Sequence, residues 1–338
     1  MPRNILDASK SLHGHIESFR EYLNSKERTS RYIKEVVNAI TEVVDGCNFN
    51  CITDISPQEV KNYLDGRRAR GKGISKRRYN FLLNMVKYFL KWAVKSNMID
   101  YSPLEVLEAL DNPDTDRRHP RRSLPADEVR RLLEAAKGGP EKFGLTGYER
   151  YLLYRFSVET GLRVNEIRTL TVQSFNFDDL TVTVKAGYSK HRRTDTQPLR
   201  PQLAVLLKQS FENKLPNVKA FGGRYKRLTD KTAEMIRFDL ANTVVKDDED
   251  NVVIEPISYG DEDIGYADFH ALRHTFITAL KSASRGKAQS LARHTSSKMT
   301  DRYTHKEMEE DREALEVLPD YSLPSTSKLR EKKDGTND

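Results

Sequence analysis

Cysteine is scarce in this sequence, which has only Cys47 and Cys51 among its 338 residues. A lone C-x3-C pair is not a disulfide framework. A zinc site would need two further ligands, and the nearest histidines, His13 and His15, do not have the spacing of a common site. The sequence therefore predicts neither a disulfide-stapled fold nor a bound metal ion.

Long hydrophobic runs are also missing. No apolar stretch reaches the roughly 20 residues that a membrane-spanning helix needs. The first residues, 1–4, lack the apolar segment of a signal peptide. We therefore expect a cytoplasmic protein that has no membrane partner.

Two motifs of phosphate chemistry are absent as well. The glycine cluster at residues 71–73 does not follow the G-x-x-x-x-G-K-[ST] pattern of a phosphate-binding loop. No carboxylate cluster suggests a two-metal nuclease. We expect no cofactor, so any chemistry on phosphates would need neither ATP nor metal.

Positive charge is in modest excess. The chain has 57 Lys and Arg residues against 50 Asp and Glu, which gives a formal net charge of +7. Clustered basic side chains most often bind phosphates, so nucleic acid is a plausible partner. A merely solvated basic surface fits the same numbers, and charge alone leaves both interpretations open.

The first part of the chain, residues 8–110, has helical patterns. Pro57 after Ser56 fits the first position of a helix. A longer helix is predicted to open after Ser75, because apolar residues then recur at helical spacing. These residues are Leu82, Met85, Val86, Phe89 and Ala93. We interpret residues 8–110 as a helical domain with this stripe in its core.

Two basic clusters are candidates for contact with a phosphate backbone. The first lies at the start of the helix after Ser75, where the helix dipole also favours an anion. The second lies in residues 111–122, which have no apolar period and read as a linker. The predicted contacts are Lys76, Arg77, Arg78, Arg117, Arg118, Arg121 and Arg122.

A second domain is predicted over residues 123–320. Its helical segments cover 147–160, 201–211, 230–241 and 268–283. Residues 180–184 alternate as a strand, and 196–199 are predicted to close a hairpin with it. The acidic stretch 246–265 suggests a short surface hairpin. The tail, 321–338, has little to bury and is expected to be flexible. The fold class is mainly α with a small β-sheet.

One segment of this domain places an imidazole and a guanidinium together. His270 and Arg273 are three positions apart, so on a helix they share one face and offer two donors to an anion. Upstream, Gly161 is predicted to end a helix, which puts Arg163 at a tight corner. Glu166, one helical turn further on, could hold the Arg163 guanidinium. Each feature alone fits an ordinary ion pair or surface pair equally well.

Together with two later residues, these features become specific. The order Arg163, His270-x-x-Arg273, His294 and then Tyr303 nine residues later resembles the signature of the phage-integrase, or tyrosine recombinase, family. The resemblance covers residues 125–310, and 8–110 resembles the family's core-binding domain more loosely. It implies a two-domain DNA clamp, with a helical core-binding (SAM-like) domain and an α+β catalytic domain.

The resemblance implies a role for each residue of the signature. Tyr303 would attack a DNA phosphodiester and form a 3′-phosphotyrosyl intermediate with a free 5′-hydroxyl. Arg163 and Arg273 would neutralise the phosphate with their forked donors. His294 would add a hydrogen bond to the same oxygens, and His270 would handle the tyrosine proton.

The family also places a lysine in the hairpin, where it protonates the leaving oxygen. Lys190 is the better match, and Lys185 at the strand end is the alternative. One departure from the family pattern is Arg293, which stands where glycine usually precedes the second histidine. No reacting group is lost by this change, so we expect an active enzyme.

The implied partner is double-stranded DNA at a specific site, bound by a homotetramer on two sites, with possible accessory directionality factors and association with the nucleoid. The segment with Leu315, Val317 and Leu318 could pass to a neighbouring protomer or pack on its own domain. Two alternative functions are a type IB topoisomerase that relaxes DNA and a non-catalytic DNA-binding protein on the same fold.

Overall fold

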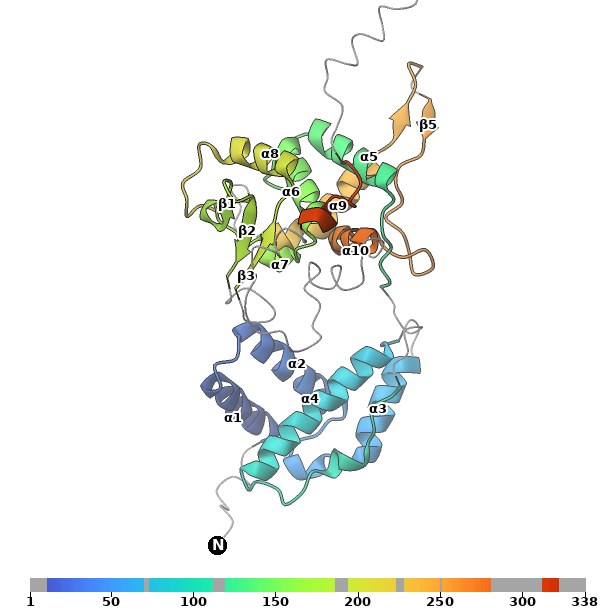
Figure 1. Ribbon diagram of the computed structural model, residues 1–338. Coiled ribbons are helices and arrows are strands. Elements are labelled where there is room, and N and C mark those ends of the chain that lie inside the picture. Colours follow the sequence, from blue (N-terminus) through green and yellow to red (C-terminus); the bar gives the residue numbers. More distant parts are fainter. Residues whose placement is uncertain are drawn as a thin grey trace, which may run out of the picture. The chain divides into compact units, whose positions relative to one another are not determined.

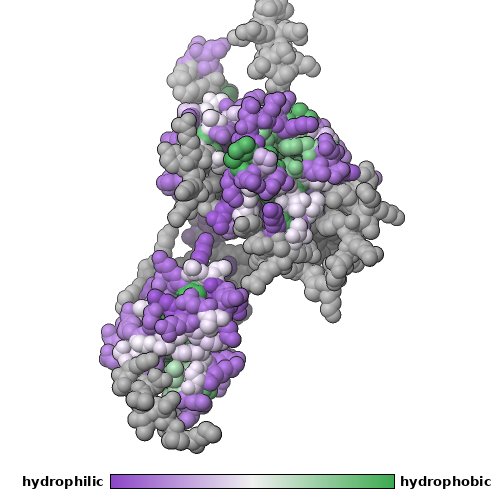
Figure 2. Space-filling model, turned by 90° about the vertical axis from the view of Figure 1, so that its left-hand side faces the viewer, coloured by the Kyte–Doolittle hydropathy of each residue, from purple (hydrophilic) through white to green (hydrophobic). Residues whose placement is uncertain are grey.

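The computed structural model describes residues 11–69, 73–111, 119–185, 194–222, 228–249, 251–280 and 312–321 (Figure 1). The chain divides into two compact units between residues 118 and 119. Each unit has its own hydrophobic core, and each is described separately below. Figure 2 shows hydrophilic residues over most of the described surface on one side of the molecule.

The first unit is helical. Its helices are α1 (Leu12–Ser25), α2 (Ser30–Gly46), α3 (Pro57–Ala69) and α4 (Lys76–Lys95), with short 3-10 turns at Ile52–Asp54 and Pro103–Val106. Hydroxyl groups cap three of these helices: Ser11, Thr29 and Ser75 each accept a hydrogen bond from a backbone N–H in the first turn. The predicted helix after Ser75 is therefore confirmed as α4.

Aromatic side chains form much of the core between α1 and α4. The Phe19 ring lies 5.2 Å from the rings of Tyr88 and Trp92 and 5.6 Å from that of Phe89. Phe19 and Phe89 are fully buried. Such edge-on and tilted contacts stabilise a core beyond the burial of area alone.

The second unit combines helices with two small sheets. Its elements are α5 (Ala126–Gly138), α6 (Gly147–Thr160), α7 (Val164–Ile167), a 3-10 turn (Val172–Ser174), β1 (Phe175–Asn176), β2 (Thr181–Val184), β3 (Asp195–Pro198), α8 (Pro201–Phe211), α9 (Leu228–Ala241), β4 (Val245–Lys246), β5 (Val252–Ile254) and α10 (Phe269–Leu280). The predicted fold class, mainly α with a small β-sheet, is confirmed.

The larger sheet has the order β1-β2-β3, and both pairings are antiparallel. The predicted hairpin forms its β2–β3 part, in which Val182 pairs with Gln197. β1 was not predicted, because a strand of two residues is too short to show an alternating pattern. The second sheet, β4–β5, lies in the acidic stretch where a surface hairpin was expected, and all three residues of β5 are exposed (Figure 1).

Helix α6 runs through the middle of the second unit (Figure 1). All its residues except Tyr148 and Glu149 are buried, and it contacts α5, α8 and α10. A helix that is covered on all sides forms the centre of a domain. The same helix buries Arg150, whose guanidinium pairs with the equally buried Asp239 of α9 at 2.9 Å.

The end of α6 determines where the next elements lie. Gly161 follows the helix with φ of +61°, a left-handed conformation that glycine adopts without strain. Its Cα faces the Phe276 ring of α10, because a β-carbon added at Gly161 would lie 2.2 Å from Phe276 Cδ1. The chain then turns into α7, and Arg163 is the residue directly before this helix.

The segment 312–321 packs on the second unit. Leu315 and Leu318 are buried with Phe276 and Leu280 of α10. Tyr321, which the sequence placed at the start of a flexible tail, is buried in the main core of this unit. The residues that follow Tyr321 in the sequence lie outside the described residues. Nowhere in the described parts is a helix both long enough and apolar enough to cross a bilayer.

Candidate functional site

The corner after α6 holds Arg163 in a fixed position. The backbone N–H of Arg163 donates to Glu166 Oε2 at 2.9 Å, and its Nη1 lies 3.2 Å from Glu166 Oε1. The Glu166 side chain is only 2% exposed, whereas that of Arg163 is 22% exposed. The buried Glu166 carboxylate thus holds the Arg163 guanidinium, as the sequence predicted. The exposed part of the guanidinium can still bind an anion.

Arg273 of α10 reaches the same corner. Its Nη1 donates a hydrogen bond to the carbonyl oxygen of Gly161, two residues before Arg163. The side chain is buried within the unit. The structure therefore brings the two predicted phosphate-binding arginines together, although they are 110 positions apart in the sequence.

His270 lies three residues before Arg273 on the same helix and keeps contact with solvent. Partial burial, together with the guanidiniums of Arg121, Arg273 and Arg163, lowers the pKa of His270 to about 4. The carboxylate of Asp268 opposes this shift. The imidazole is therefore neutral at neutral pH, in the form that can accept a proton.

A carboxylate stands at the start of α10. Asp268 Oδ1 accepts a hydrogen bond from the backbone N–H of Ala271 at 3.0 Å, which caps the helix. The same carboxylate binds Arg121 Nε, at 3.0 Å from Oδ1 and 2.8 Å from Oδ2. His119 Nε2 lies 3.1 Å from Oδ2. The residue pattern did not identify this group, although an Asp directly before an expected helix is a favoured capping residue.

The predicted DNA contacts of the linker differ in their surroundings. Arg117 and Arg118 lie outside the described residues. Arg121 is engaged by Asp268. Arg122 is largely covered: its Nη1 lies 2.5 Å from Glu128 Oε2, and its Nη2 donates to the Ser258 carbonyl at 3.0 Å. Residues 119–122 thus belong to the second unit rather than to a free tether.

The basic cluster of the first unit lies at the start of α4. Arg77 is exposed and Lys76 is half-buried. Arg78 is also exposed, but its guanidinium pairs with Glu42, whose other oxygen binds Arg67 at 2.7 Å. Contact of Arg78 with a phosphate would have to compete with this carboxylate.

Several predicted residues lie outside the described residues: Lys190, Arg293, His294 and Tyr303. Lys185, the alternative hairpin lysine, is exposed directly after β2. The predicted roles of these residues remain predictions.

Metal-ligating groups are sparse in the parts that the structure describes. No cluster of three or more His, Cys, Asp or Glu side chains is found there. Burial, together with the nearby Glu59 carboxylate, raises the pKa of the Cys47 thiol to about 11, so the thiol stays protonated at neutral pH.

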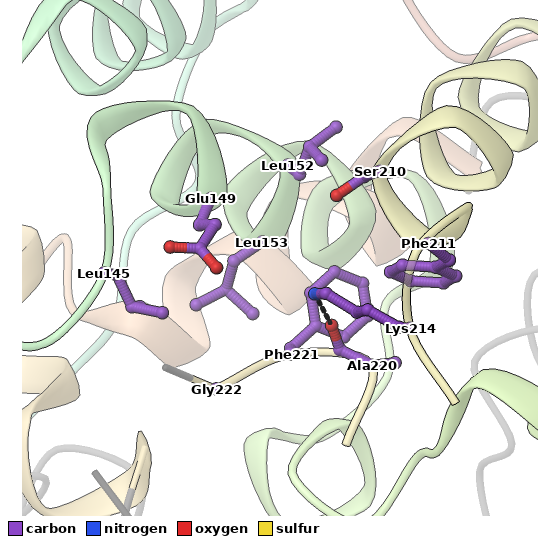
Figure 3. Close-up of a pocket in the computed structure, with 10 residues that line it drawn as sticks. All are labelled: Leu145, Glu149, Leu152, Leu153, Ser210, Phe211, Lys214, Ala220, Phe221 and Gly222. Atoms are coloured by element: carbon purple, nitrogen blue, oxygen red, sulfur yellow. Dashed lines mark hydrogen bonds between the residues drawn. The ribbon is translucent and has the colours of Figure 1, made fainter. Parts of the chain in front are cut away.

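A small pocket lies at the other end of α6 (Figure 3). Leu152, Leu153 and Phe211 provide apolar walls, and Lys214 Nζ donates to the Ala220 carbonyl at 3.2 Å. The pocket lies beside the first half of α6, whereas Arg273 binds the Gly161 carbonyl directly after the last residue of this helix. Two charged groups of the pocket are used in local hydrogen bonds, Glu149 with the backbone of Thr146 and Lys214 with the Ala220 carbonyl. The arginine corner is therefore the better candidate site.

Comparison with known proteins identifies chains that share this fold. In structure, the chain is similar to a lambda integrase dimer bound to a COC′ core site, with a TM-score of 0.64 and 18% identity over 87% of this chain and 100% of that one. It is also similar to the Tn1549 transposon integrase in complex with transposon right end DNA, with a TM-score of 0.59 and 15% identity over 95% of this chain and 98% of that one. At such identities these matches show the shared fold.

No curated protein matches the chain in sequence. The model of the phage integrase family matches residues 122–310. This range is more than half of the chain, and it contains Arg163, His270 and Arg273 of the site together with the positions of His294 and Tyr303. The chain therefore belongs to the phage integrase family.

Proposed function

We propose that this protein is a site-specific DNA recombinase that cuts and rejoins strands through a covalent bond to Tyr303. The observation that carries the proposal is that Arg273 binds the Gly161 carbonyl, two residues before Arg163, whose guanidinium is held by Glu166, with His270 on the same helix as Arg273. In a member of the phage integrase family, such a corner is suited to hold the scissile phosphate.

The two arginines would bind the non-bridging oxygens. A guanidinium is charged at all relevant pH values, and its planar fork matches two oxygens of a phosphate. The negative charge that develops on these oxygens during attack would be stabilised most by donors that are already in place. Glu166 and the Gly161 carbonyl hold the two guanidiniums before DNA arrives.

Proton transfer would involve the remaining groups. His270 is neutral before DNA binds, so it can accept the proton of the Tyr303 hydroxyl as the phenolate attacks phosphorus. The bond from phosphorus to the 5′ oxygen would break, and Lys190, or alternatively Lys185, would protonate that oxygen. His294 would donate a hydrogen bond to the phosphate. The phosphotyrosyl bond conserves the energy needed for rejoining, so no ATP is required.

DNA is the proposed partner along both units. The lambda integrase structures that resemble this chain include a dimer on a core site and a tetramer on a Holliday junction. By analogy we propose a homotetramer on two duplex sites, association with the nucleoid, and phosphate contacts by Lys76, Arg77, Arg78 and the linker arginines. Accessory directionality factors remain part of this proposal.

A nicked suicide substrate tests the function. Incubated with purified protein, it should give a covalent protein–DNA adduct, and the adduct should disappear in Tyr303→Phe. Arg163→Ala and Arg273→Ala should also abolish the adduct while most DNA affinity remains, because other basic groups hold the backbone. Equal losses of binding and cleavage in the arginine variants would contradict the assigned roles.

Strand exchange between two sites then distinguishes the enzyme classes. A recombinase joins the cleaved strand to a second duplex, whereas a topoisomerase relaxes supercoils without exchanging partners. An adduct with relaxation but no exchange would transfer the assignment to the topoisomerase class. Specific DNA binding without any adduct would indicate a non-catalytic DNA-binding protein.

A further inference from the structure

The carboxylate at the start of α10 links two parts of the second unit that lie far apart in the sequence. Asp268 caps the helix that carries His270, because its Oδ1 accepts from the Ala271 N–H at 3.0 Å. Its two oxygens also bind Arg121 Nε at 3.0 and 2.8 Å. The Asp268 side chain is only 14% exposed, so this ion pair is partly shielded from solvent.

The segment around Arg121 is also held through its backbone. Tyr266 N–H donates to the Pro120 carbonyl at 2.8 Å, and Arg122 N–H donates to the Tyr266 carbonyl at 3.3 Å. The His119 ring stacks on that of Tyr266, with 4.0 Å between centroids and 13° between planes. These contacts bring residues 119–122 alongside the chain that enters α10.

The charged groups that face His270 come from three places. Arg163 stands at the start of α7, Asp268 and Arg273 belong to α10 and its cap, and Arg121 comes from residues 119–122. Of the three arginines, Arg121 has the largest effect on the pKa of His270. Its distance from the imidazole depends on the carboxylate that holds its guanidinium.

We propose that Asp268 is a positioning residue for the reaction, which sets the charge around His270 by holding Arg121 against the first turn of α10. Only the expected effect of this coupling on DNA cleavage rests on the proposed function. The electrostatic coupling itself exists in the free protein. Arg121, expected from the sequence to bind a DNA phosphate, thus acts also on the group that handles the tyrosine proton.

A double-mutant cycle in the free protein tests the coupling. The full-length chain is labelled on histidine, and the titration midpoint of His270 is followed by NMR, with His270→Gln assigning its signal. Arg121→Gln removes a nearby cation and should raise the midpoint by roughly half a pH unit, the scale expected for one partly exposed charge. Arg130→Gln changes the net charge equally on the surface of α5 and should leave the midpoint unchanged.

The decisive comparison is made in Asp268→Asn, which keeps a capping oxygen but loses the charge. There Arg121 is no longer held, so Arg121→Gln should move the midpoint by less than half as much as in the wild type. An equal shift in both backgrounds, or none in the wild type, would overturn the proposal. Asp268→Ser, which also keeps a capping oxygen, serves if the Asn variant does not fold.

Cleavage provides the second readout. In the suicide-substrate assay, the acid limb of the pH profile should shift in Arg121→Gln in the same direction as the NMR midpoint, with DNA affinity measured separately. A protein that forms no adduct but shows the NMR coupling would contradict the proposed function and support this inference. A protein that cleaves DNA but lacks the NMR coupling would support the proposed function and contradict this inference.

Discussion

At the scale of single residues, Gly161 has the most constrained position near the site. It ends α6 in a left-handed conformation, faces the Phe276 ring, and offers its carbonyl to Arg273. Any side chain here would meet both backbone strain and a collision with a buried ring. The glycine therefore contributes to stability and to the placement of the arginine at once.

Gly161→Ala should lower the free energy of unfolding by roughly 2–4 kcal/mol, from the strained backbone and from overpacking against Phe276. Urea unfolding measures the change. Gly138→Ala is a matched control at the end of α5, where an added methyl group meets nothing within 4 Å. If both variants unfold at the same urea concentration, Gly161 does not pack closely against Phe276.

Residue patterns predicted part of this site and not the rest. The Arg163–Glu166 pair could be expected because residues three apart on a helical turn are neighbours, and both are contained in one short segment. The contact of Arg273 with Gly161 and the network of Asp268 with Arg121 join positions more than 100 residues apart. No local spacing reveals such pairs, because only the fold brings them together.

At the scale of elements, segment 312–321 covers one side of α10. In the structure, Leu315 and Leu318 pack on the α10 of their own chain, which is one of the two arrangements that the sequence allows. Arg200 Nη1 and Arg130 Nε also donate to the carbonyls of Pro319 and Asp320 at 3.2 Å each. The segment is thus part of the folded unit.

Leu315→Ala should destabilise the second unit by roughly 2–5 kcal/mol, as expected for a buried leucine shortened to alanine. Val317→Ala in the same segment should have little effect, because Val317 is 44% exposed. The loss of stability is measured by thermal unfolding at several protein concentrations. A loss that grows on dilution would show that the segment packs on a second protomer instead.

Secondary structure was predictable where caps and periodicity were strong. Helices over 147–160 and 201–211 have the bounds expected from the sequence, the first because Thr146 and Glu149 form a capping box and Gly161 ends the helix. α9 begins two residues earlier than predicted. Boundaries of this kind depend on tertiary contacts, which local propensity does not contain.

At the scale of the whole molecule, the chain has separate cores. The apolar cluster of the first unit contains buried residues from Leu12 to Leu104, and the main cluster of the second contains residues from Leu124 to Tyr321. The two sets share no residue. The sequence placed the change between domains in the basic stretch 111–122, and the units divide between residues 118 and 119.

Because the cores are separate, residues 1–118 and 119–338 should each fold when expressed alone. Each fragment should unfold cooperatively, with a midpoint near the corresponding transition of the full chain. Calorimetry of the fragments and of the intact protein makes the comparison. If the fragment 119–338 melts without a cooperative transition, the core of the second unit depends on the first unit.

The ion pair inside the second unit has a consequence for how this sequence can vary. Arg150 and Asp239 are both fully buried, and Tyr154 donates a further hydrogen bond to the same carboxylate at 2.7 Å. Loss of either charge leaves the other without a counter-ion in a dry interior, which costs about 3–5 kcal/mol. In related sequences, positions 150 and 239 should therefore change together or not at all, so that substitutions at this contact between α6 and α9 occur in pairs.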